Sequence, residues 1–107
     1  MAEKKAESKA VQPKMIKGKT SSGLKYQINP DVTDDLRVLM YMTTMSKEDV
    51  GVLERSQALF DLMGLMFGDQ TPAFMNEVAH LHGGVADAKS VYAELKEILE
   101  AAKLKNS

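Results

Sequence analysis

The 107-residue sequence lacks cysteine and tryptophan, and its aromatic residues are three tyrosines and three phenylalanines. Without cysteine the chain has no disulfide, no cysteine-ligated zinc and no thiol nucleophile. It also lacks an apolar run long enough to cross a bilayer, and residues 2–14 lack the apolar centre of a signal peptide. These absences predict a soluble, intracellular protein of one small domain.

Charge is nearly balanced overall, at a formal −1, but it is unevenly distributed. Residues 1–19 carry six lysines against two glutamates, so the rest of the chain is acidic. Residues 1–13 show no periodicity and are predicted to form a disordered basic arm before a domain over residues 14–104. Lysine-rich ends are commonly solvated, and this one lacks arginine and aromatic residues, so nucleic-acid binding is kept as the alternative function.

Two short alternating segments follow the arm. They read KMIKGKT and LKYQI, and Ser21, Ser22 and Gly23 separate them. The alternation and the glycine predict a β-hairpin with one buried face, formed by Met15, Leu24, Tyr26 and Ile28. Because a lone hairpin is only marginally stable in water, we expect it to lie on the helices or to pair with another chain.

Four helices are predicted after the hairpin, which makes the fold class mainly α. They cover about residues 34–45, 52–67, 72–81 and 85–104. Thr33 is the expected cap of the first helix, and the acidic pair Asp34 and Asp35 suits the positive end of its dipole. Gly68 is expected to end the second helix.

Apolar spacing predicts which faces of these helices are buried. In the first helix the expected core stripe is Leu36, Leu39, Met40 and Thr43, with further apolar residues on its sides. In the last helix an apolar stripe that includes Val85 is expected to face the core, and charged residues that include Glu94 are expected on the other face.

No arrangement in the sequence is typical of an enzyme or a metal centre. Gly18, Lys19 and Thr20 imitate the end of a phosphate-binding loop but precede a turn and a strand instead of a helix. His80 and His82 diverge on a helix, so they are poorly placed to ligate one metal and are expected to be solvated or capping residues. We therefore expect no catalytic residue, no metal and no cofactor.

The second helix, 52–67, has the widest apolar surface in the chain. Leu62 and Leu65 extend its stripe, and six of the eight methionines of the chain lie in the first helix, in this helix or in the segment after Gly68. Methionine suits surfaces that accept varied apolar partners, although it also fills irregular cores. We expect the first half of this helix to be core and its end to bind a partner, through Leu62, Met63, Leu65, Met66, Phe67, Phe74 and Met75.

Three segments together resemble the tail assembly chaperones of long-tailed phages. GLKYQINPDVTDDLRVLMYM is similar to the opening strand and acidic helix start of that family, and ALFDLMGLMFGDQ to its leucine-rich helix ending in Gly-acid-Gln. VADAKSVYAELKEILEAA is similar to its final helix, so that the resemblance covers residues 15–103. The sequence departs from the family pattern in having methionine where leucine is frequent.

This resemblance implies a non-catalytic, mostly helical protein of phage or prophage origin that acts in the host bacterial cytoplasm. Its implied partner is the tape measure protein, which it would keep soluble while the tail tube assembles, and it is not expected in the mature virion. The tail tube protein and a second copy of the chain are further candidate partners. An acidic body with an apolar groove would suit such a helical client.

Overall fold

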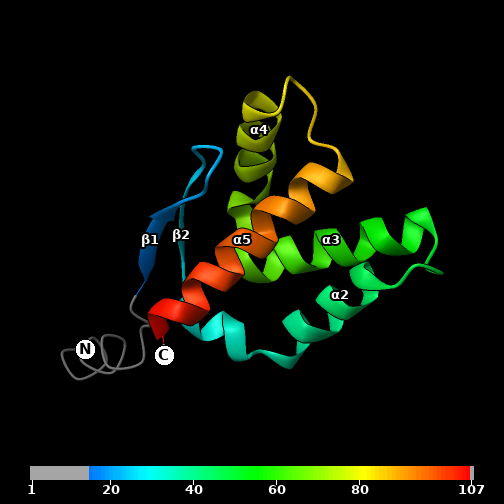
Figure 1. The fold of residues 1–107 in the computed structure, drawn as a ribbon, viewed down its shortest axis with the longest axis horizontal. Coiled ribbons are helices and arrows are strands. Elements are labelled where there is room, and N and C mark those ends of the chain that lie inside the picture. Colours follow the sequence, from blue (N-terminus) through cyan, green and yellow to red (C-terminus); the bar gives the residue numbers. More distant parts are fainter. Residues whose placement is uncertain (1–14, 107) are drawn as a thin grey trace, which may run out of the picture.

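A computed structural model of the protein describes residues 15–106. This part of the chain is mainly helical and has a short two-stranded antiparallel sheet at its amino-terminal side (Figure 1). The predicted fold class is confirmed at this level. The predicted disordered arm, residues 1–13, lies outside the described residues.

The hairpin consists of β1 (Ile16–Lys19) and β2 (Lys25–Ile28). Gly18 lies opposite Tyr26 in the ladder, and Lys19 lies opposite Lys25. The turn is closed by a bond from the Thr20 amide to the Leu24 carbonyl oxygen at 2.9 Å. Gly23 has a φ of 99°, a conformation that glycine adopts without strain. The hairpin and its turn were predicted from the alternation and from this glycine.

The helices are α2 (Leu36–Ser46), α3 (Val52–Phe67), α4 (Thr71–Leu81) and α5 (Ala88–Asn106). Two short 3-10 helices, η1 (Pro30–Asp34) and η2 (Gly68–Gln70), were not predicted, so the described residues contain more helical segments than expected. Gly68 ends α3 with a φ of 58°, as predicted. The last helix begins three residues later than predicted, because Asp87 caps it: its carboxylate accepts hydrogen bonds from Ser90 and its carbonyl accepts one from the Val91 amide.

The predicted cap of the first long helix was wrong. Asp35 has extended backbone angles and its carboxylate accepts a hydrogen bond from the Arg37 amide at 2.8 Å, so Asp35 caps α2. Thr33 instead donates its hydroxyl to the Pro30 carbonyl oxygen within η1. Pro30 starts that short helix because its fixed φ suits a first helical position.

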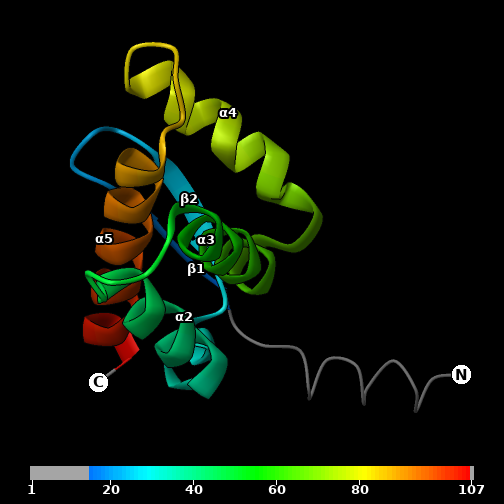
Figure 2. The same ribbon diagram turned by 90° about the vertical axis from the view of Figure 1, so that its right-hand side faces the viewer.

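One core joins the hairpin to α3, α4 and α5. Figure 2 shows α3 nearly end-on at the centre, with α5 on one side and the strands between them. The largest side chains that are almost completely buried come from all four elements: Leu24, Ile28, Leu62, Met63, Leu95, Ile98 and Val78. The core therefore has α3 at its centre, which agrees with the breadth of its apolar surface in the sequence.

The burial predicted for α2 was wrong. Its core-facing residues are Val38 and Met45, with Tyr41 and Met42 partly buried beside them. The predicted core stripe of Leu36, Leu39, Met40 and Thr43 faces solvent instead. At about 100° per residue, the centres of the two sets lie on nearly opposite sides of the helix. Spacing alone shows that both stripes exist, and packing against α3 decides which of them is buried.

Candidate interaction surfaces

Most of the residues predicted to bind a partner lie in the core of the monomer. Leu62 is 0% exposed and Met63 is 1% exposed, while Met66 and Phe74 are also buried. Leu65, Phe67 and Met75 are partly buried against the same core. The exposure expected for the end of α3 is therefore not found, because these side chains pack in the core that α3 shares with α4, α5 and the hairpin. Whether any of these side chains contacts a partner stays a prediction.

The first half of α3, which was expected to be core, is the more exposed half. Val52 and Leu53 at its start are 77% and 86% exposed, and Phe60, just after the midpoint of the helix, is 52% exposed. Leu53 and Phe60 are seven residues apart and so lie on one side of the helix, away from Leu62 and Met66. The half expected to be core is thus exposed at its start and buried only at Ala58 and Leu59, whereas the second half supplies Leu62, Met63 and Met66 to the core.

A second exposed apolar stripe lies on α2 and is called here the outer α2 stripe, formed by Leu36, Leu39 and Met40. These side chains are 76%, 52% and 54% exposed, at the i, i+3, i+4 spacing that places them on one face. Single exposed apolar residues are ordinary, but three neighbours on one helical face are typical of a surface that binds an apolar partner.

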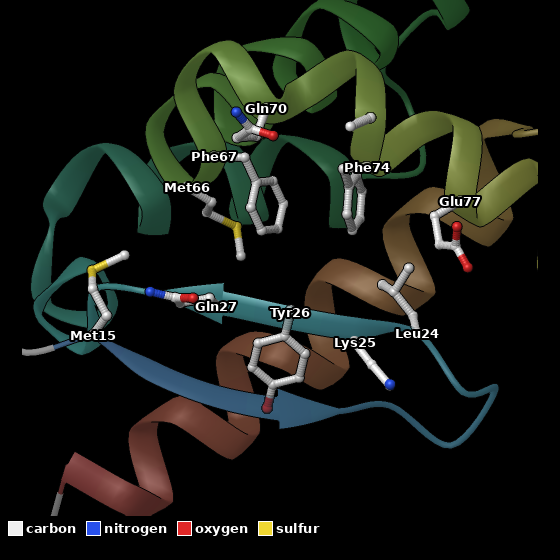
Figure 3. A pocket seen from close by; sticks show the side chains of 11 residues that line it. Met15, Leu24, Lys25, Tyr26, Gln27, Met66, Phe67, Gln70, Phe74 and Glu77 are labelled. Atoms are coloured by element: carbon white, nitrogen blue, oxygen red, sulfur yellow. The ribbon is translucent and has the colours of Figure 1, made fainter.

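A groove of about 530 Å³ runs between β2 and the wall formed by the end of α3 and by α4 (Figure 3). Leu24, Met66 and Phe74 contribute apolar surface to it, and Phe67 stacks on Phe74 with ring centroids 4.4 Å apart. Polar side chains at its rim include Lys25, Gln27, Gln70 and Glu77. Three residues of the predicted partner surface, Met66, Phe67 and Phe74, are therefore brought together here, although two of them are mostly covered.

A polar cluster connects the hairpin turn to α5, and sequence reasoning missed it. Glu94 is only 3% exposed, although it was assigned to the solvated face of the last helix. Its Oε2 accepts a hydrogen bond from the Ser22 hydroxyl at 2.5 Å and lies 2.6 Å from His82 Nε2. Next to this contact, Glu97 accepts hydrogen bonds from the amide and the hydroxyl of Ser21. The turn is thus held on α5 by two carboxylates.

The pKa of Glu94 reflects its surroundings. Burial by itself would raise this pKa, but hydrogen bonds from Ser22, His82 and Thr20, with the nearby charge of His82, lower it below its ordinary value. The position could have been suspected, because Glu94 follows Val91 by three residues and precedes Ile98 by four, within the buried stripe. The hydrogen-bond partners of Glu94 could not have been predicted, because Ser22 and His82 come from two other parts of the chain.

The cluster of Ser22, His82 and Glu94 is not arranged for nucleophilic catalysis. The carboxylate lies between the hydroxyl and the imidazole, so the imidazole is not the base that receives the hydroxyl proton. A carboxylate with a lowered pKa is also a weak base at neutral pH. The geometry suits a structural connection between the turn, the loop after α4 and α5.

Within residues 15–106, no group of three or more His, Asp or Glu side chains is placed to hold a metal ion. No helix in the same range combines the length and the apolar character that crossing a membrane requires. Comparison of the chain with protein-family models, with curated proteins and with solved structures finds no match.

Proposed function

We propose that this protein is a phage tail assembly chaperone that binds the tape measure protein and keeps it soluble while the tail tube assembles. The order of the three segments that resemble this family supports the proposal, as does a mainly helical fold with exposed apolar surface. The chain acts without catalysis, in the host bacterial cytoplasm, and leaves the tail before the virion is complete.

The observation that carries the proposal is the outer α2 stripe. A helical client presents apolar residues at the same i, i+3, i+4 spacing, so two helices pack by fitting the ridges of one into the grooves of the other. Fully burying one exposed leucine or methionine side chain contributes about 1.5–3 kcal/mol, which is offset against the entropy lost on association, so the stripe contributes to the affinity together with further contacts. Leu53 and Phe60 on the exposed side of α3 provide further apolar surface in the same helical hairpin.

The core position of Met63 and Met66 changes how the proposal is tested. Glutamate at either site would leave an unpaired charge in the interior and unfold the protein, so lost client binding would prove nothing about docking. Leu36 and Met40 are exposed, and glutamate there leaves the core intact. The outer α2 stripe therefore allows the docking surface to be separated from the fold.

The test is co-expression of the chain with the tape measure protein of the phage or prophage that encodes it. The double variant Leu36→Glu with Met40→Glu should keep its helical circular dichroism and its melting temperature, but leave the client insoluble. The matched control is Val85→Glu with Leu104→Glu, which adds the same charge at apolar positions that are 64% and 77% exposed outside α2 and α3. Equal client solubility with both double variants would contradict the proposal, as would a client that stays soluble without the chain.

A further inference from the structure

The free edge of β2 has an arrangement of backbone groups that fits another strand. In an antiparallel ladder, opposite residues alternate between pairs that exchange two hydrogen bonds and pairs that exchange none. The Thr20 amide bonds to the Leu24 carbonyl, so the bonded pairs fall at Gly18 with Tyr26 and at Ile16 with Ile28. The amides and carbonyls of Lys25 and Gln27 consequently point away from β1, toward the free edge.

This edge opens into the groove of Figure 3. The groove is lined by Leu24 and Tyr26, whose side chains lie on the inner face of the sheet, and also by Lys25 and Gln27 from the outer face. A cavity that borders both faces of one strand runs along its edge. The outward backbone groups of Lys25 and Gln27 therefore border a space of about 530 Å³ whose far wall includes Phe67 and Phe74.

Two lysines of the sheet lie beside this edge on its outer face, and Glu77 of α4 lines the groove across from it. Lys19 lies directly opposite Lys25 in the ladder, and both side chains lie on the outer face of the sheet. Like charges directly opposite each other destabilise a sheet, so the fold gains nothing from this pair. No ion pair joins Lys19 or Lys25 to an acidic side chain within residues 15–106. Acidic side chains of a partner would complement this face.

We propose that the free edge of β2 binds an extended segment of another protein, in which apolar residues alternate with acidic ones, as a third strand. The apolar side chains of that segment enter the groove beside Phe67 and Phe74, on the inner side of the sheet. Its acidic side chains lie on the outer side, next to Lys25. Its backbone bonds with Lys25 and Gln27, and a third strand stabilises a sheet that is marginal with two.

This surface is separate from the outer α2 stripe and takes an extended segment where that stripe takes a helix. The inference therefore goes beyond the proposed function and does not depend on it. Failure of the client assay leaves strand binding to be decided by its own experiment, because the residues that are changed in the two experiments differ.

Amide hydrogen exchange in the full-length chain tests the edge directly. The amides of Lys25 and Gln27 should exchange quickly in the free protein, whereas those of Tyr26 and Ile28 are protected by the ladder. The probe is a synthetic peptide of about seven residues in which valine or phenylalanine alternates with glutamate. At saturation it should slow exchange at Lys25 and Gln27 by at least about tenfold.

Two variants and one control locate the binding. Lys25→Glu removes the charge complementarity and also relieves the repulsion with Lys19, so it should fold well and weaken peptide binding by about tenfold. Lys96→Glu makes the same charge change at an exposed position of α5 and should leave binding unchanged. Gln27→Pro removes an outward amide at a position where an edge strand tolerates proline, and should also weaken binding.

Several results would overturn the inference. Binding that is equal for Lys25→Glu and Lys96→Glu, or binding without protection of the two amides, would show that the peptide does not add to β2. If a peptide with lysine in place of glutamate binds equally well, charge complementarity with Lys25 does not contribute to binding. Tighter binding of single-stranded oligothymidylate would assign the lysine face to nucleic acid. Protection that rises with protein concentration alone would assign the edge to a second copy of the chain.

Discussion

Helices α5 and α2 have similar apolar spacing and opposite relations to solvent. In α5, Val91, Leu95 and Ile98 are buried and most charged residues lie outside, as the sequence predicts for an amphipathic helix. In α2, two apolar residues are buried and Leu36, Leu39 and Met40 remain exposed. Helix α5 therefore contributes mainly to the stability of the fold, whereas α2 retains exposed apolar surface that folding does not bury.

The largest expected difference between these regions is in stability. Leu95→Ala in α5 removes a completely buried side chain and should lower the free energy of unfolding by about 2–5 kcal/mol. Leu39→Ala, the same change on the outer α2 stripe, should change it by less than about 0.5 kcal/mol. Urea denaturation of both variants checks the pair. Similar losses for the two would mean that the outer stripe is part of the core.

The polar connection between the turn and α5 should have the next largest effect. Glu94→Ala removes the acceptor for Ser22 and the partner of His82, and should lower the free energy of unfolding by about 1–3 kcal/mol. Glu100→Ala is the matched control, because Glu100 is exposed on the same helix. If the two variants are equally stable, the buried carboxylate does not hold the turn on α5.

The lowered pKa of Glu94 predicts that the free energy of unfolding depends on pH. The folded pKa of Glu94 lies below its unfolded value, so its contribution to stability is complete above about pH 4.3 and is lost as pH falls through the lower folded pKa. Asp35 and Asp87, whose pKa values are also lowered, act in the same direction. Glu94→Gln should therefore lose less stability than the native protein between pH 5 and pH 3, as measured by urea denaturation. An identical pH profile would contradict this assignment.

A smaller effect is expected within the hairpin. The Tyr26 ring lies across Gly18, so a side chain at that position would contact the phenol directly. Gly18→Ala should destabilise the protein by about 1 kcal/mol or more through displacement of the ring. Gly64→Ala inside α3 is the control, because no atom lies near the added methyl group there and alanine is the better helix former, so this variant should not be destabilised. A stable Gly18→Ala protein with an unmoved Tyr26 would show that the ring does not depend on this glycine.

The fold was largely predictable from local signals, and the surfaces were not. Gly23 and Gly68 marked a turn and a helix end, and the spacing of Val91, Leu95 and Ile98 gave the core face of α5, because each signal acts within a few residues. Leu39 and Glu94 were assigned to the wrong environment. For both, burial is decided by another element, α3 for Leu39 and the hairpin turn for Glu94, and periodicity contains no information on which face that element covers.

The central claim is that the outer α2 stripe docks the client, and the lack of cysteine allows a direct test of it. Single variants Leu39→Cys and Leu104→Cys place one thiol on the stripe and one on an exposed position of α5. The rate of labelling by a maleimide is measured for each, with the chain alone and in complex with the tape measure protein. Labelling of Leu39→Cys should slow strongly in the complex while that of Leu104→Cys is unchanged. Unchanged labelling of Leu39→Cys in a stable complex would contradict the claim.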